Sequence, residues 1–251
     1  MTGVRIFETV ADISNHCLDR VMAAGRPGSV AVSFGGTYSE IFSLWRDRLL
    51  SSREEGQPHS SPLPSFFPAD ERLVPPEHED SNWGGFRRLF LNDCGSGADS
   101  RRHAAGLKEF KEILDDYFHG PPRFDLIFLG LGADGHTASL FPGGCPGAED
   151  SCWHEPVLAT DSPLPPHGRL SLGPETIASA GELIMTVTGS GKSGILLKLV
   201  EQLKSAEPQN DELPPARIIR RRTALKKDTV ILIDRAAADG AGGSITEGVI
   251  A

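Results

Sequence analysis

The chain has 251 residues, of which 39% are hydrophobic and 24% are charged, and its formal net charge is −9 at pH 7. A chain of this size can bury a substantial core, and we expect a single domain over residues 1–251. The acidic balance argues against a nucleic acid or an anionic membrane surface as the main partner. Any anionic ligand must therefore be held by a local cluster of cations.

The cysteines show no C-x-x-C pair and no dense spacing; they are Cys17, Cys94, Cys145 and Cys152. This usage favours a reduced, cytoplasmic setting over a disulfide framework. Two of these cysteines and His154 could bind a metal in principle, but their spacing is not one that zinc sites use. Residues 1–11 lack the apolar region of a signal peptide, and the chain has no run of about 18 apolar residues. We therefore expect neither export nor a membrane span.

Strand and helix patterns alternate along the chain. The predicted strands lie near 5–8, at 29–34, from Ser65 into Asp70, and at 126–129, 169–172, 182–187 and 229–234. The predicted helices lie at 10–25, 39–50, 83–91, 104–117, 174–180 and 194–205. This alternation predicts an α/β fold, a three-layer sandwich in which a mostly parallel, Rossmann-like sheet is flanked by helices.

The segments between these elements are rich in Pro, Gly, Ser or charge. We expect loops at 51–64 and 92–102, a long irregular connection at 142–168, a polar linker at 207–215, a solvated basic helix or loop at 217–227, and a loose glycine-rich tail at 239–251.

The stretch 124–143 is the most informative part of the sequence. Its strand, Leu126 to Leu129, is apolar on both faces, which is typical of a covered parallel sheet. Gly130, Gly132 and Gly135 then allow a tight turn, which presents Asp134 and His136 just beyond the carboxyl end of the strand. Ligands of open α/β sheets bind at that edge.

Other predicted strands end in groups that bind anions. Gly35, Gly36 and Thr37 form a turn at a helix start, where free backbone N–H groups suit a phosphate. Arg72 follows Asp70 at the end of another strand, and Lys192 stands before a helix after a further glycine turn. Together with His136, these groups suggest a small phosphorylated substrate on which a histidine acts.

Two partial motifs are misleading. Gly130-x-Gly132-x-x-Gly135 matches the dinucleotide fingerprint, but Pro142 follows where a long helix should run, and Asp134 would face a pyrophosphate. The segment around Lys192 resembles the end of a P-loop, but Thr186 occupies the position of its first glycine.

The stretch 124–143 resembles the signature of the 6-phosphogluconolactonases, and the similarity to that family extends over roughly residues 5–236. Asp70-Glu71-Arg72, followed by Val74-Pro75 and Ser81-Asn82, is similar to a second motif of the family. Arg169–Leu172 and the segment Val187–Gly189 with Lys192 are similar to a third and a fourth.

The related glucosamine-6-phosphate deaminases share the Asp-Gly-His core. Their pattern continues toward Asn-Glu-Pro-Gly where this chain has Leu140–Gly143, and they carry an aromatic residue in place of Arg72. Both differences favour the lactonase. One departure concerns the first glycine turn, because the family commonly has Ser-Gly-Gly-Ser-Thr-Pro where this chain has the bulkier Phe34 and Tyr38 around its glycines.

The resemblance implies hydrolysis of 6-phospho-D-glucono-1,5-lactone to 6-phosphogluconate in the oxidative pentose phosphate pathway, without a metal or organic cofactor. It implies His136 as the general base. Asp134 would orient the imidazole or bind substrate hydroxyls. The substrate-binding residues would be Gly35, Gly36, Thr37, Asp70, Arg72, Arg169 and Lys192, most of them around the 6-phosphate.

The alternatives are a deaminase/isomerase acting on glucosamine 6-phosphate and a non-catalytic sugar-phosphate-binding protein. The expected partner is a small sugar phosphate, with no nucleic acid and no membrane, for a monomer or small homo-oligomer.

Overall fold

The computed structural model describes residues 1–24, 28–55, 63–94, 104–144, 151–207 and 211–250. The strands are β1 (Thr2–Phe7), β2 (Ser29–Val32), β3 (Ser65–Pro68), β4 (Asp70–Arg72), β5 (Leu126–Gly130), β6 (Val157–Asp161), β7 (Gly168–Leu172), β8 (Glu182–Val187), β9 (Thr229–Asp234) and β10 (Gly248–Val249). The helices are α1 (Val10–Ala24), α2 (Gly36–Glu54), α3 (Asn82–Phe86), α4 (Asn92–Cys94), α5 (Leu107–Phe118), α6 (Pro174–Ser179), α7 (Ser193–Lys204), α8 (Pro214–Ala224) and α9 (Arg235–Gly240). Shorter turns of π-helix or 3-10 helix lie at Arg87–Leu91, Ser151–His154 and Ser190–Lys192.

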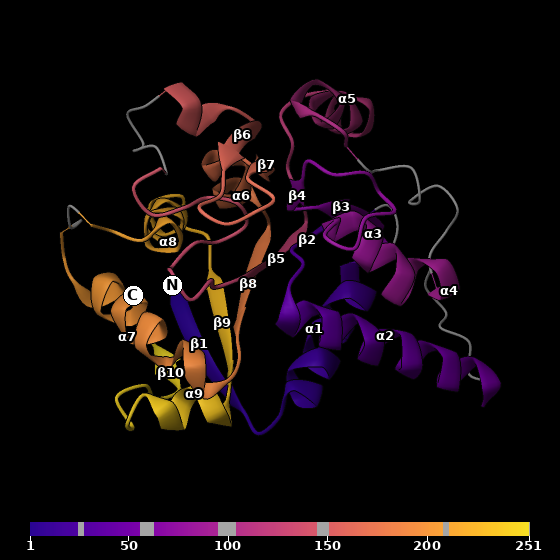
Figure 1. The fold of residues 1–251 in the computed structure, drawn as a ribbon. Helices are drawn as coiled ribbons and strands as arrows, with labels where there is room; N and C mark the ends of the chain where they lie inside the picture. Colours follow the sequence, from indigo (N-terminus) through magenta and orange to yellow (C-terminus); the bar gives the residue numbers. More distant parts are fainter. Residues whose placement is uncertain (25–27, 56–62, 95–103, 145–150, 208–210, 251) are drawn as a thin grey trace.

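A seven-stranded sheet, in the order β10-β1-β9-β8-β5-β2-β3, forms the centre of the molecule. β10 pairs antiparallel with β1, and the other neighbours pair in parallel. Helices α1 and α2 lie on one side of this sheet and α7 and α8 on the other (Figure 1). The predicted mostly parallel sheet flanked by helices is therefore confirmed.

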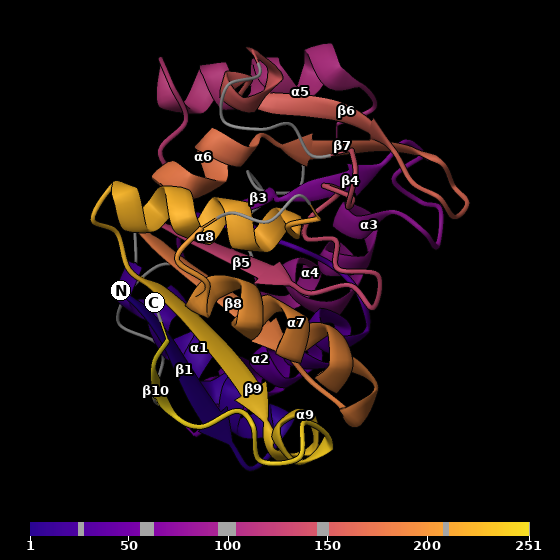
Figure 2. The ribbon, with the colours of Figure 1, turned by 90° about the vertical axis from the view of Figure 1, so that its left-hand side faces the viewer.

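Each face of the sheet carries its own apolar core, because successive side chains of a strand point to opposite faces. On β5, Leu126 and Phe128 pack with α1, α2 and α3, whereas Ile127 and Leu129 pack on the other side. Figure 2 shows α7 and α8 in front of the strands on that other side, where α5 and α6 also contribute buried residues. The strands are apolar on both faces for this reason.

The order of the strands reverses between β2 and β5. The chain moves from β2 outward to β3, whereas β5, β8 and β9 follow one another on the opposite side of β2. Loops that leave the carboxyl ends on either side of such a point diverge and leave a crevice between them. Here the two diverging loops are the glycine turn after β2 and the Asp134–His136 loop after β5.

A smaller antiparallel sheet, β4-β7-β6, was not predicted as a unit. The sequence indicated the brief strand β7 and one strand running from Ser65 into Asp70, which the structure divides between β3 of the large sheet and β4 of the small one. β6 falls within the stretch 142–168 that was expected to be irregular. β6 alternates buried and exposed positions over only five residues, and its proline-rich surroundings hide that pattern. Residues 145–150 of the predicted connection, and parts of the predicted loops at 51–64 and 92–102, lie outside the described residues.

The segment 239–250, which was expected to be loose, is not free of contacts with the rest of the fold. Gly248 and Val249 pair with β1, the Glu247 carboxylate accepts a hydrogen bond from the Ile6 N–H (2.9 Å), and Ile245 is buried. A strand pairing, a hydrogen bond and one buried apolar residue thus connect this glycine-rich segment to the fold.

The basic stretch 217–227 is not a solvated face either. It forms most of α8, in which Arg220 pairs with Glu212, Arg221 pairs with Glu175, and Arg222 is fully buried. Within the described ranges, no helix is both long enough and apolar enough to cross a membrane.

Arg222 links α8 to the sheet. Its guanidinium donates to the carbonyl oxygens of Ala178 (3.0 Å), Ala180 (2.8 Å) and Asp228 (2.5 Å). Burial lowers the pKa of Arg222 to about 10. The cost of burying this charge is offset by hydrogen bonds to several buried or partly buried carbonyl groups.

We predict that Arg222→Met lowers the free energy of unfolding by about 3 kcal/mol or more, because buried carbonyl groups lose their donor. Urea denaturation measures the change. The matched control is Arg48→Met, which removes an ion pair with Asp19 whose side chains are largely exposed, and it should change stability little. Equal losses in the two variants would contradict this role for Arg222.

Candidate active site

The first glycine turn follows β2 and begins α2. Gly35 has φ +154° and ψ −178°, and the N–H and hydroxyl of Ser39 both donate to its carbonyl oxygen (2.8 and 2.9 Å). The Thr37 hydroxyl lies 2.6 Å from the Thr188 hydroxyl, which belongs to the loop after β8. Two turns that are far apart in the sequence are therefore joined across the site.

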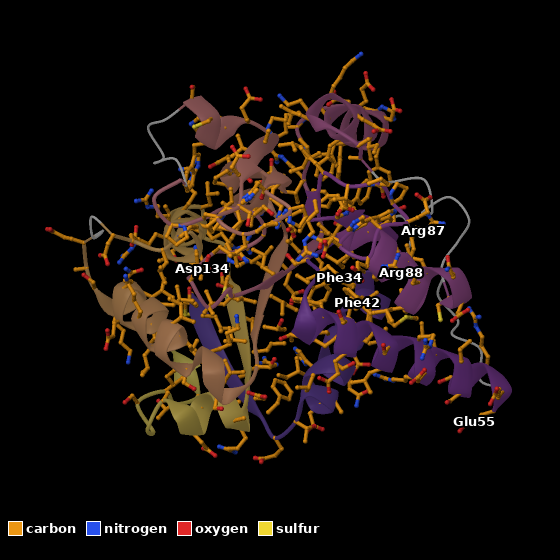
Figure 3. The ribbon with its side chains drawn as sticks, viewed as in Figure 1. Phe34, Phe42, Glu55, Arg87, Arg88 and Asp134 are labelled. Atoms are coloured by element: carbon orange, nitrogen blue, oxygen red, sulfur yellow. The ribbon has the colours of Figure 1, made fainter. Side chains whose placement is uncertain are left out.

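The bulky residues of this turn pack into the protein. Tyr38 is buried and donates its hydroxyl to the Leu129 carbonyl oxygen (2.9 Å). The ring of Phe34 stacks on that of Phe42 (centroids 6.1 Å apart) and lies against Gly85, where a Cβ atom would be 2.3 Å from the ring. Figure 3 shows Phe34 and Phe42 together on the α2 side of the molecule. The departure from the family pattern is thus accommodated by a glycine in α3.

The loop after β5 is a tight turn that carries Asp134 and His136. The Gly132 N–H donates to the His136 carbonyl oxygen (2.8 Å), and Gly135 has φ +91°. A Cβ atom at Gly132 would lie 2.2 Å from His136 Nδ1 and 2.6 Å from Asp134 Oδ1. Glycine at this position therefore lets the imidazole and the carboxylate meet above the backbone.

Asp134 and His136 form a close pair, with Oδ1 and Nδ1 2.5 Å apart, and Oδ1 also accepts from the His136 backbone N–H (3.2 Å). Partial burial acts to raise the pKa of Asp134, but the hydrogen bonds from His136 and its charge outweigh burial and lower that pKa. A carboxylate in contact with Nδ1 favours a proton on that nitrogen, which leaves Nε2 as the basic atom of the neutral ring.

Glu71 fixes the strand that carries Asp70 and Arg72, a role that the sequence did not indicate. Its fully buried carboxylate accepts hydrogen bonds from the backbone N–H groups of Arg72 (2.7 Å), Asn82 (2.7 Å) and Trp83 (2.9 Å). The start of α3 is thereby bound to β4.

Asp70 is buried next to the Asp134–His136 loop. Its Oδ2 accepts from the Ser139 hydroxyl (2.9 Å) and from the Asn82 side-chain amide (3.1 Å). Burial raises the pKa of Asp70, and the hydrogen bond from Ser139 and the charges of Arg72, His136 and Arg169 offset only part of this rise.

Arg72 and Arg169 are paired residues on the antiparallel strands β4 and β7. Arg72 donates to the Asp80 carbonyl oxygen (2.9 Å), and Arg169 is 7% exposed. Burial, and then the charge of Arg72, lower the pKa of Arg169. Like charges at paired positions repel each other, so this arrangement favours a bound anion between or beside them.

Lys192 ends the turn after β8, residues 188–192, which we call the lysine turn. Gly189 has φ +85° there, and the lysine precedes the first residue of α7. Burial lowers the pKa of Lys192, and the nearby Asp134 carboxylate acts in the opposite direction. Figure 3 shows Asp134 on the side of the molecule formed by α7 and α8.

These loops enclose a cavity of about 470 Å³ at the carboxyl ends of β2, β5 and β8. Among the residues predicted from sequence, those that line it are Gly35, Gly36, Thr37, Asp70, Arg72, His136, Arg169 and Lys192. Asp134 is not part of the lining, and its carboxylate contacts Nδ1 of the imidazole. The predicted residues are thus brought together around one space.

The cavity has further lining residues to which the sequence analysis assigned no role in the site. They include Ser33, Ser139, Phe141, Ser162, Leu164, Pro165, Thr186 and Thr188. Thr188 belongs to the motif Val187–Gly189 and could have been assigned to the site, since it directly precedes the glycine of the lysine turn. Ser162, Leu164 and Pro165 belong to the β6–β7 connection and had no signal, because the pairing of those strands was not predicted.

Comparison with known proteins identifies the family. The profile of the family described as glucosamine-6-phosphate isomerases/6-phosphogluconolactonase matches residues 4–230. The chain belongs to this family. A 6-phosphogluconolactonase from Rattus norvegicus is 31% identical over 217 residues, which are 82% of this chain and 80% of the rat protein.

Solved structures of the family share the fold. A 6-phosphogluconolactonase from Leishmania guyanensis superposes with a TM-score of 0.70 at 23% identity, covering 98% of this chain and 99% of that one. A monomeric glucosamine-6-phosphate deaminase superposes with a TM-score of 0.68 at 18% identity, covering 94% and 98%. Because both kinds of enzyme have this fold, the fold alone does not separate the two activities.

We predict that Asp70→Asn raises the midpoint temperature of unfolding at pH 7. Burial raises the folded-state pKa of Asp70, so the folded protein binds a proton more readily than the unfolded chain and bears a cost when the carboxylate is charged. As the pH falls toward about 4, the wild-type carboxyl group becomes neutral and the advantage of the variant should shrink.

Differential scanning calorimetry between these pH values measures the difference. Asp116→Asn, at an exposed position of α5, is the matched control and should have little effect at any pH. The prediction would be contradicted if the gain in unfolding temperature of Asp70→Asn over wild type were smaller at pH 7 than at pH 4.

Proposed function

We propose that this chain hydrolyses 6-phospho-D-glucono-1,5-lactone to 6-phospho-D-gluconate, with His136 as the general base. The observation that carries the proposal is the Asp134–His136 pair, whose imidazole lines the cavity that also contains Arg72, Arg169, Lys192 and the first glycine turn. Membership of the family and the similarity to the rat lactonase support the choice of reaction.

The proposed reaction begins with water in the cavity. Nε2 of His136 takes a proton from this water as its oxygen attacks the lactone carbonyl carbon, and a tetrahedral oxyanion forms. When this intermediate collapses, the bond from the carbon to the ring oxygen breaks, and the imidazolium returns its proton to that oxygen. The products are a carboxylic acid, which ionises, and a free hydroxyl group.

The cations have a positioning role in this proposal. Arg72, Arg169 and Lys192, with the backbone N–H groups of the turn Gly35–Thr37, hold the 6-phosphate. A substrate anchored at one end presents its carbonyl group to His136 in a fixed geometry, which lowers the entropic part of the barrier. Asp70 is available for a substrate hydroxyl group.

We predict that His136→Ala lowers kcat by about 10²- to 10⁴-fold, the usual contribution of a general base. Acid release from freshly generated 6-phosphogluconolactone is followed against the spontaneous rate. The matched control, His154→Ala, removes an exposed histidine outside the cavity and should retain activity. If the wild type is no faster than buffer, the lactonase proposal fails, and deamination of glucosamine 6-phosphate and then simple binding are the reactions to test.

A second prediction separates the two possible roles of Asp134. An amide in its place can donate to Nδ1 and so put the ring proton on Nε2, where it blocks proton abstraction. We expect Asp134→Asn to lower kcat by about 100-fold with little change in KM, as a residue that orients a general base should. A rise in KM with an unchanged kcat would instead indicate that Asp134 binds substrate hydroxyl groups.

A further inference from the structure

The lysine turn is held from the neighbouring strand β9. Asp234, the last residue of β9, accepts the Gly189 N–H with both carboxylate oxygens (2.9 and 3.1 Å). Asp234 is 7% exposed and does not line the cavity. This carboxylate therefore binds the backbone of the lysine turn, and it is not placed to contact a ligand in the cavity.

The same carboxylate also fixes the helix that packs against the turn. Its Oδ1 accepts the Ala237 N–H (2.9 Å) at the start of α9. α9 in turn contacts the first residue of α7, because the Ser193 hydroxyl donates to the Ala237 carbonyl oxygen (2.9 Å) and a Cβ atom at Gly240 would lie 2.2 Å from that hydroxyl. One side chain thus sets the position of the lysine turn from two directions.

We propose that Asp234 is the positioning residue of the lysine turn, and that it determines how tightly the site holds the phosphate of its substrate. The inference rests on the proposed function in one respect, namely that Lys192 contacts that phosphate. Asp234 acts through the Gly189 N–H, which fixes the φ +85° conformation from which residues 190–192 leave the sheet.

The sign of the effect distinguishes positioning from charge. A carboxylate near an anionic ligand repels it, so neutralising Asp234 should strengthen phosphate binding if its charge were all that mattered. If Asp234 positions the turn, neutralising it should weaken phosphate binding, because Lys192 is then no longer held in the position from which it contacts the phosphate.

The experiment measures binding of 6-phosphogluconate by isothermal titration calorimetry, which does not depend on turnover. We expect Asp234→Ala to raise Kd by about tenfold to a hundredfold, the scale of effect of a misplaced binding group. Asp234→Asn keeps one acceptor oxygen for Gly189 and should be milder. Asp228→Asn removes an exposed carboxylate from the residue preceding β9, and it should leave Kd unchanged.

A second readout excludes general damage to the fold. The ratio of kcat/KM for 6-phosphogluconolactone to that for unphosphorylated glucono-1,5-lactone should fall in the Asp234 variants, because only the phosphorylated substrate uses the turn. Gly189→Ala reaches the same turn with Asp234 intact, since a side chain is strained at φ +85°, and it should lower the ratio too.

An unchanged or lower Kd in both Asp234 variants would overturn the inference, and so would equal losses on the two lactones. If the wild type binds 6-phosphogluconate but hydrolyses neither lactone, the proposed function fails while the binding series still decides the role of Asp234. If the wild type does not bind 6-phosphogluconate, the inference fails as well.

Discussion

The parallel pairing of β2, β5, β8 and β9 is the constraint on which the site depends. Because the strands run in the same direction, their carboxyl ends meet at one edge of the sheet, and each ends in a turn or residue that serves the cavity. The reversal of strand order between β2 and β5 separates the first two turns and leaves room for a ligand between them. The buried apolar pattern of these strands on both faces is what keeps them in the middle of the sheet.

Charge is distributed so that an acidic protein still places cations beside its cavity. Many basic side chains are engaged within the protein or on its surface, as Arg222 is with carbonyl groups and Arg221 is with Glu175. Arg72 and Arg169 are instead placed as neighbours beside the cavity, where their mutual repulsion makes a bound anion favourable. The net charge of −9 therefore says little about the ligand, because the field inside the cavity is set by nearby groups.

Several carboxylates close to the cavity accept hydrogen bonds from the protein itself and fix the position of nearby segments. Glu71 accepts backbone N–H groups of β4 and α3, and Asp234 accepts those of the lysine turn and α9. Asp134 holds the imidazole of His136. In each case a buried or half-buried negative charge is satisfied by hydrogen-bond donors, which lessens its repulsion of an anionic ligand.

The sequence by itself determined the parallel α/β architecture, because fully apolar runs alternate with amphipathic helices and glycine turns follow the strands. It also indicated that the first glycine turn, His136 and Lys192 gather at the cavity, since the strand ends of a parallel sheet converge. Asp70 and Arg169, which lie on the antiparallel sheet, were indicated by the family resemblance. Pairings between distant segments could not be read from local pattern, and they include the antiparallel sheet β4-β7-β6, the addition of β10 to β1 and the burial of Arg222. Only the tertiary structure decided that Phe34 packs on Gly85 and that Asp234 supports the lysine turn, because each of these contacts depends on where another segment of the chain lies.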